Sequence, residues 1–230
     1  MKLYAFNSCP YCTRVRALIG LKQLACEVEF IVFGGLPAPV VEQLTKFTVP
    51  VLQTSTPMDE QLFVMAESLD IFKHLDQMEE AYFTHYNPSP QINELLSDMQ
   101  KTSALLCYPR MPYLGLPELA TLSALNSFIE TREQIIGMSF GEALQATAQF
   151  VSSIQDTLRS LLIQLDAEAL LAGKRRLGID DIIVFSELRN LTMIAELQFT
   201  AEQASYLNEL VKLTHVPLYP QVDWIAENEK

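Results

Sequence analysis

The chain has 230 residues, of which 49% are apolar, and it carries a formal net charge of −12 at pH 7. This length allows one large or two modest domains, and the apolar fraction is enough for a core that needs no disulfide or metal to hold it together. The acidic charge argues against nucleic-acid binding, because a phosphate backbone would be repelled. No run of 18 apolar residues predicts a membrane span and no secretory signal pattern opens the chain, so we expect a soluble cytoplasmic protein.

The first 78 residues alternate between strand and helix patterns. Strands are predicted over residues 2–6, 28–33, 49–53 and 61–65, and helices over residues 10–22, 38–47 and 67–78. The first strand–helix–strand unit predicts a parallel pair with a right-handed crossover, and the last two strands are close enough for a hairpin. Gly20 interrupts the first helix pattern, where glycine costs about 1 kcal/mol relative to alanine, and it is compatible with close packing on the sheet.

Residues 79–90 contain two prolines and no periodicity, and we interpret them as a linker. After the linker the pattern predicts helices over residues 91–108, 118–136, 139–165, 179–197 and 201–214. The sequence therefore predicts an α/β domain at 1–78 and an all-helical domain at 91–230. The helix that follows Asp180 and Asp181 is apolar on nearly all sides, so we expect it to form the core of the second domain, with the two acids as capping groups and Arg189 paired with an acid.

The motif Cys9-Pro10-Tyr11-Cys12 lies between the first strand and the first helix. If Cys9 is the N-cap, Cys12 falls on the same side in the first turn, and the free amides and helix dipole favour a Cys9 thiolate. The two sulfurs are near enough to form a disulfide. Cysteines in such motifs have pKa values of roughly 3.5–7.5, so Cys9 is the expected nucleophile and the deeper Cys12 the resolving thiol. Residues 1–26 hold no acid, and their bases include three candidate thiolate stabilisers: Arg14, Arg16 and Lys22.

Three other interpretations of the cysteine pair remain open. Zinc needs about four ligands, and the chain has neither a second C-x-x-C motif nor histidines at ligand spacing, so we expect no metal. An iron–sulfur cluster bridged between two subunits would need only one exposed cysteine from each. The third interpretation is that two core thiols lie close together by chance, which would not explain the Pro-Tyr insert or the basic surroundings. We expect Cys26 and Cys107 to be inert buried thiols.

Two further segments could complete a site beside the dithiol. Pro50 precedes a strand, and a cis Val49–Pro50 bond would turn the Val49 backbone toward the cysteines, where it could pair with a peptide-like thiol; an ordinary trans proline is the alternative. Glu67 and Ser68 begin a helix whose free amides suit a carboxylate, although either residue could serve only as a helix cap. Together with the dithiol, these segments indicate a site for a small acidic thiol.

These motifs, "CPYC", "VPVLQ" and "ESLDI", resemble those of the glutaredoxins. With its helical second half, "GIDDIIVFSELRNLT" and "YPR", the chain is similar to two-domain bacterial glutaredoxins of the glutaredoxin 2 type, which have a glutathione transferase-like architecture. The resemblance implies a thioredoxin-like first domain and glutathione as the reducing co-substrate. It also implies glutathione contacts from Tyr11, Val49, cis Pro50, Glu67 and Ser68. The chain departs from the family at Ser8, where a histidine is frequent, and at Gly178, where Ser or Thr is frequent.

The resemblance predicts a monomeric glutathione-dependent disulfide oxidoreductase acting on protein disulfides and glutathione mixed disulfides through Cys9 and Cys12. A glutathione transferase is the alternative enzyme, with Met111, Tyr113 and Leu114 lining an apolar pocket at the domain seam. A transferase has no need of Cys12. A non-enzymatic adaptor is the third hypothesis, and the intact dithiol argues against it. The protein substrates are not specified by the sequence.

Overall fold

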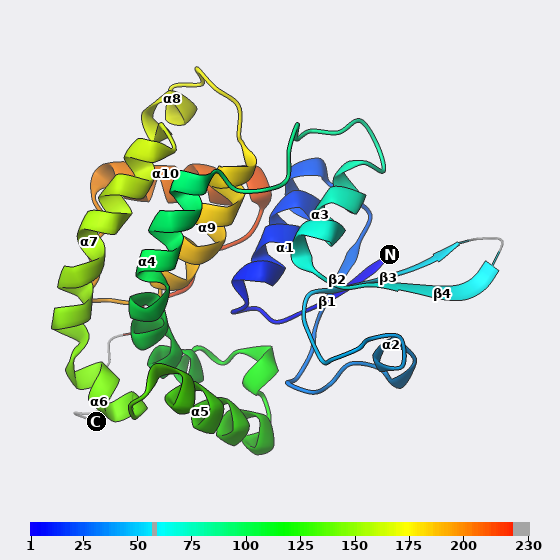
Figure 1. Ribbon diagram of the computed structural model, residues 1–230, viewed down its shortest axis with the longest axis horizontal. Helices are drawn as coiled ribbons and strands as arrows, with labels where there is room; N and C mark the ends of the chain where they lie inside the picture. Colours follow the sequence, from blue (N-terminus) through cyan, green and yellow to red (C-terminus); the bar gives the residue numbers. More distant parts are fainter. Residues whose placement is uncertain (57–58, 223–230) are drawn as a thin grey trace.

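The computed structural model describes residues 1–56 and 59–222. Its first domain is a four-stranded sheet with helices on both faces (Figure 1). The elements of this domain are β1 (Lys2–Ala5), α1 (Pro10–Lys22), β2 (Glu27–Phe30), α2 (Ala38–Val41), β3 (Val51–Thr56), β4 (Asp59–Met65) and α3 (Ser68–Asp76). The strand order is β2-β1-β3-β4. β1 and β2 are parallel, and β3 is antiparallel to both β1 and β4, which confirms the predicted parallel pair and hairpin.

The two faces of the sheet have separate cores because successive strand residues point to opposite sides. Leu3 and Ala5 of β1 and Leu52 of β3 pack against α1 and α3. Tyr4 and Val51 point the other way and form a smaller cluster on the side of α2. The predicted helix over residues 38–47 is only the four-residue α2, so that prediction was too long.

The second domain is helical wherever the structure describes regular elements, apart from an isolated bridge between Ile194 and Val222. Its elements are α4 (Pro90–Cys107), the 3-10 helices η1 (Tyr108–Leu114) and η2 (Pro117–Leu119), α5 (Leu122–Ile136), α6 (Phe140–Gln145), α7 (Thr147–Gln164), α8 (Ala167–Leu171), α9 (Ile179–Leu191) and α10 (Ala201–Thr214). Residues 223–230, the end of the predicted second domain, lie outside the described part.

Three helix predictions for the second domain differ from the structure. The expected helix at 139–165 is divided at Ala146, whose ψ of 7° leaves the helical region, into α6 and α7. The expected helix at 118–136 begins as η2 and restarts at Leu122, where Thr121 accepts a capping bond from the Ala124 N–H. The helix at 179–197 ends at Leu191. Hydrophobic periodicity continues through all three breaks because the flanking residues stay in one core.

α9 is the central helix of the second domain, as predicted, with eleven of its thirteen residues buried. It packs on α4 on one side and on α1 of the first domain on the other (Figure 1). Its start is capped by Asp181, whose carboxylate accepts the Gly178 N–H at 2.7 Å. Asp180 instead accepts the backbone N–H of Ser89, which ties the start of α9 to the end of the linker.

Gly20 lets α1 approach the second domain closely. A Cβ atom at this position would lie 1.8 Å from the backbone oxygen of Thr214, at the end of α10. The close packing expected of this glycine is therefore against α10 and not against the sheet. The contact helps to hold α1, and with it the cysteine motif, against the helical domain.

Candidate active site

Cys9 and Cys12 lie at the start of α1, in the arrangement that the sequence predicts. Cys9 is the N-cap, Pro10 is the first helical residue, and the Cys9 sulfur accepts the Cys12 backbone N–H at 3.4 Å. Cys9 is partly accessible, whereas Cys12 is fully buried. All four cysteines are free thiols. The more accessible sulfur is thus held at the helix N-terminus, with the second sulfur behind it.

The surroundings of the two sulfurs move their pKa values in opposite directions. The hydrogen bond from the Cys12 thiol lowers the pKa of Cys9, and the backbone N–H groups of Cys12 and Tyr11 add to this effect. Burial and the Glu187 carboxylate act against it, but the net shift is downward. Burial raises the pKa of Cys12 well above its ordinary value, and the hydrogen bond to Cys9 raises it further. The Cys9 thiol is therefore the more easily ionised of the two, and the Cys12 thiol stays protonated.

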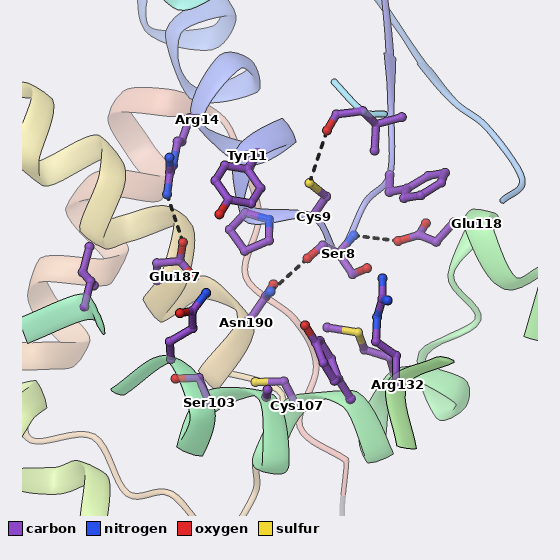
Figure 2. A pocket seen from close by; sticks show the side chains of 18 of the residues that line it. Ser8, Cys9, Tyr11, Arg14, Ser103, Cys107, Glu118, Arg132, Glu187 and Asn190 are labelled. Atoms are coloured by element: carbon purple, nitrogen blue, oxygen red, sulfur yellow. Dashed lines mark hydrogen bonds and ion pairs between the residues drawn. The ribbon is translucent and has the colours of Figure 1, made fainter. Parts of the chain in front are cut away.

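The helical domain fixes the two residues that precede Cys9. The Glu118 carboxylate accepts the backbone N–H of Ser8 at 2.7 Å and that of Asn7 at 3.1 Å (Figure 2). The Asn190 side chain donates to the Ser8 carbonyl at 2.9 Å, and Arg189 donates to the Asn7 carbonyl at 2.9 Å. The backbone N–H and C=O groups of Asn7 and Ser8 are therefore all bonded by side chains from the other domain.

The sequence did not predict these roles for Glu118, Arg189 and Asn190. Arg189 was expected to pair with an acid, but it forms no ion pair with an acid of residues 1–56 or 59–222. It is buried, and it bonds Asn7, the Pro217 carbonyl at 2.7 Å and the Tyr219 hydroxyl at 2.7 Å. Polar residues inside a very apolar helix were the available signal, since buried polar groups require partners. Their partners in the first domain, Asn7 and Ser8, lie 182 residues away in the chain, which the pattern could not reveal.

The three candidate thiolate stabilisers have different surroundings. Arg14 stacks on the Tyr11 ring at 4.5 Å and forms an ion pair with Glu187 at 3.1 Å. Arg16 bonds the Asn7 side chain at 3.3 Å, and burial, together with the charge of Arg189, lowers its pKa to about 10. Neither arginine is a main cause of the lowered pKa of Cys9, which comes chiefly from hydrogen bonds.

Lys22 is placed away from the thiolate, so its predicted stabilising role was wrong. It is the last residue of a thirteen-residue helix, about 20 Å along the axis from the Cys9 end. Its ammonium group bonds the Asp76 carboxylate at 3.2 Å and the Glu80 carbonyl at 3.0 Å. Asp76 also accepts the backbone N–H groups of Tyr82 and Phe83. Lys22 therefore anchors the start of the linker.

The Val49 backbone faces the dithiol, as expected. The Val49–Pro50 peptide bond is cis, and the Val49 carbonyl lies 4.0 Å from the Cys9 sulfur. Glu67, with φ of 69°, precedes α3 and is exposed, and Ser68 is the buried first residue of that helix. Neither lines the cleft next to Cys9, which Leu69 reaches from the same turn.

A cleft of about 790 Å³ opens between the domains beside Cys9. Tyr11 and Arg14 line it from the first domain (Figure 2). Val49 lines it from the same side, and α4, α5 and α9 supply the opposite wall. Of the three residues expected to line an apolar pocket, Met111 does so, but Tyr113 and Leu114 do not. On the helical side the cleft is lined by residues that include Leu96, Met99, Ser103, Cys107, Tyr108, Met111, Phe128, Arg132, Glu187 and Asn190.

The two remaining cysteines differ from each other. Cys107 is buried, and burial raises its pKa to about 12, so its thiol is protonated near neutral pH. Cys26 is only partly buried, so the expectation of a buried thiol was wrong there. Within residues 1–56 and 59–222, no three His, Cys, Asp or Glu side chains gather as a metal site, and no helix is long and apolar enough to cross a bilayer.

Comparison with known proteins places both halves of the chain. Residues 91–223 match the family model of the glutaredoxin 2 C-terminal domain, and residues 3–82 match that of the glutathione S-transferase N-terminal domain. The chain is 29% identical to glutaredoxin 2 of Escherichia coli strain K12 over 218 residues, which are 95% of this chain and 97% of that protein.

Solved structures show the same architecture. The crystal structure of glutaredoxin 2 from Salmonella typhimurium in complex with glutathione matches with a TM-score of 0.79 and 27% identity, over 94% of this chain and 95% of that one. FzlA from C. crescentus matches with a TM-score of 0.57 and 15% identity, over 91% of this chain and 86% of that one, and shares the fold.

Proposed function

The chain belongs to the glutaredoxin 2 family, and we propose that it is a glutathione-dependent thiol–disulfide oxidoreductase whose nucleophile is Cys9. The observation that carries this proposal is the pair of sulfurs at the start of α1. One is accessible with a lowered pKa, and the other is buried and protonated behind it. A transferase or an adaptor would not need the second sulfur.

The chemistry is thiol–disulfide exchange. The Cys9 thiolate attacks the glutathione sulfur of a mixed disulfide, a Cys9–glutathione disulfide forms, and the substrate thiol leaves with the electron pair. A second glutathione thiolate then attacks the bound glutathione sulfur, which releases Cys9 as a thiolate and forms glutathione disulfide. With a protein disulfide, Cys12 attacks Cys9 in the mixed disulfide instead, and two glutathiones reduce the resulting Cys9–Cys12 disulfide.

We propose that glutathione lies along the cleft edge of the first domain. The Val49 backbone, next to cis Pro50, would pair with its cysteinyl part, and Tyr11 would border the groove. Glu67 and Ser68 would hold the γ-glutamyl end at the start of α3, where free amides favour a carboxylate. The Salmonella relative was solved in complex with glutathione, which supports glutathione as the ligand.

The experiment is glutathione-dependent reduction of a small mixed disulfide by the wild type, Cys9→Ser and Cys12→Ser. We expect activity in the wild type and loss of activity in Cys9→Ser. Cys12→Ser should still reduce the glutathione mixed disulfide, because that reaction needs only Cys9. Full activity in Cys9→Ser would refute the assignment of the nucleophile.

A glutathione transferase is the second candidate, because the cleft is large and its helical wall includes Met99, Met111 and Phe128. Conjugation of glutathione to a chlorinated aromatic acceptor tests it. Conjugation that survives Cys12→Ala in a protein without disulfide exchange would favour the transferase.

We further propose that the chain is divided into domains at residues 1–78 and 91–230 and that the protein is a monomer with a cytoplasmic location. Its proposed substrates are glutathionylated or disulfide-bonded proteins.

A further inference from the structure

The helical wall of the cleft carries polar atoms that have no partner. Five buried side-chain polar atoms lack a hydrogen bond among the described residues, and three of them belong to the lining of this cleft: Ser103 Oγ, Arg132 Nε and Asn190 Oδ1. Asn190 is only 7% exposed, and its amide nitrogen already donates to Ser8, so the free atom is its acceptor. Because buried polar groups normally have partners, this concentration at one wall indicates a polar ligand.

Arg132 is the cation of this wall. Its guanidinium lies 5.2 Å from the Tyr108 ring centre and 5.3 Å from that of Phe128, and it projects into the cleft below Ser8 and Glu118 (Figure 2). No acidic side chain in the described part of the chain forms an ion pair with it. The two cleft carboxylates have other partners, since Glu118 bonds two backbone amides and Glu187 pairs with Arg14. A cation held by aromatic rings and without a carboxylate partner is suited to bind an anion.

We propose that Arg132, with the Asn190 acceptor and the Ser103 hydroxyl, forms a subsite for glutathione on the helical wall, opposite the glutathione edge of the first domain. Arg132 would bind a carboxylate, and Asn190 Oδ1 would accept a peptide N–H. A peptide thiol carries both groups, whereas a simple thiol carries neither. The proposal rests on the function proposed above and names the side chains that would recognise the co-substrate on the helical side.

Two glutathione molecules take part in the exchange, and either could present this chemistry. One forms the disulfide with Cys9. The other attacks that disulfide, so that the Cys9–glutathione bond breaks, the electron pair returns to the Cys9 sulfur, and glutathione disulfide leaves. The experiment separates the two molecules by replacing one at a time with 2-mercaptoethanol, which has no carboxylate and no amide.

The test uses the full chain with Cys12→Ser, which keeps the Cys9–glutathione disulfide from closing internally. The first rate is reduction of that disulfide by glutathione, and the second is its reduction by 2-mercaptoethanol. The third is attack of reduced Cys9 on the mixed disulfide of glutathione and 2-mercaptoethanol. Each is measured in Arg132→Gln, in Arg132→Lys, and in Lys101→Gln, a control that removes a cation from an exposed position on α4 outside the cleft.

We expect Arg132→Gln to slow a glutathione-specific step roughly tenfold, as the loss of a charge-assisted bond predicts, with a smaller effect in Arg132→Lys and less than twofold in Lys101→Gln. If only the reduction of the Cys9–glutathione disulfide by glutathione becomes slower, the subsite binds the attacking glutathione. If the attack of reduced Cys9 on the mixed disulfide of glutathione and 2-mercaptoethanol becomes slower, the subsite binds the glutathione that becomes linked to Cys9. Unchanged rates in Arg132→Gln would overturn the subsite. So would an equal fall in Cys9 alkylation by iodoacetamide, which would indicate a structural effect. A wild type without any glutathione-dependent turnover would instead reject the proposed function.

Discussion

Replacement of Glu118 by glutamine is expected to destabilise the protein and disturb Cys9. The carboxylate is 3% exposed and accepts two backbone N–H bonds, from Ser8 at 2.7 Å and from Asn7 at 3.1 Å. Glutamine offers only one acceptor oxygen, so one charge-assisted bond becomes neutral, at a cost of about 1 kcal/mol, and one buried N–H faces an NH₂ group, at about 1–3 kcal/mol. The free energy of unfolding should therefore fall by roughly 2–4 kcal/mol.

Urea unfolding of Glu118→Gln measures this loss. Glu130→Gln is the matched control, because Glu130 is an exposed acid on α5 and its replacement should change stability by less than about 0.5 kcal/mol. Iodoacetamide alkylation at pH 7 adds a local readout, since Ser8 directly precedes Cys9, and we expect its rate to change in Glu118→Gln only. Equal stability of the two variants would show that the Glu118 bonds do not hold the active-site loop.

Three further predictions concern α1. The pH midpoint of Cys9 alkylation should lie below the pKa of roughly 8.5 of a free thiol. Cys12→Ala should move this midpoint to higher pH, because the hydrogen bond from the Cys12 thiol is the largest cause of the lowered Cys9 pKa. A midpoint that does not move in Cys12→Ala would contradict that cause. Gly20→Ala should cost at least about 1–3 kcal/mol by overpacking against α10. Gly141→Ala on α6, where a Cβ would meet only the Ser139 Oγ at 4.0 Å, should be stabilising by up to about 1 kcal/mol. Thermal unfolding that shifts the two variants alike would refute the clash. Lys22→Gln breaks a buried ion pair with Asp76, so urea unfolding should show that the free energy of unfolding falls by about 3 kcal/mol. The rate of Cys9 alkylation should stay at the wild-type value. A slower rate would show that Lys22 does stabilise the thiolate.

Much of the fold could be predicted because strand and helix patterns are local. The α1 helix and α10 have the predicted bounds, and the parallel and antiparallel pairings follow from loop lengths. Helix breaks such as Ala146 were missed because apolar periodicity continues across them. The charge near the cysteines was also misinterpreted, since sequence proximity placed Lys22 beside Cys9 although a helix separates them.

The sequence by itself determined the dithiol, because N-cap geometry and sulfur spacing depend only on consecutive residues from Cys9 to Cys12. The tertiary structure decided what surrounds it. Glu118 reaches Ser8 across 110 positions of the chain, and Asn190 does so across 182. Such contacts depend on how two domains pack, and neither periodicity nor motif spacing carries that information.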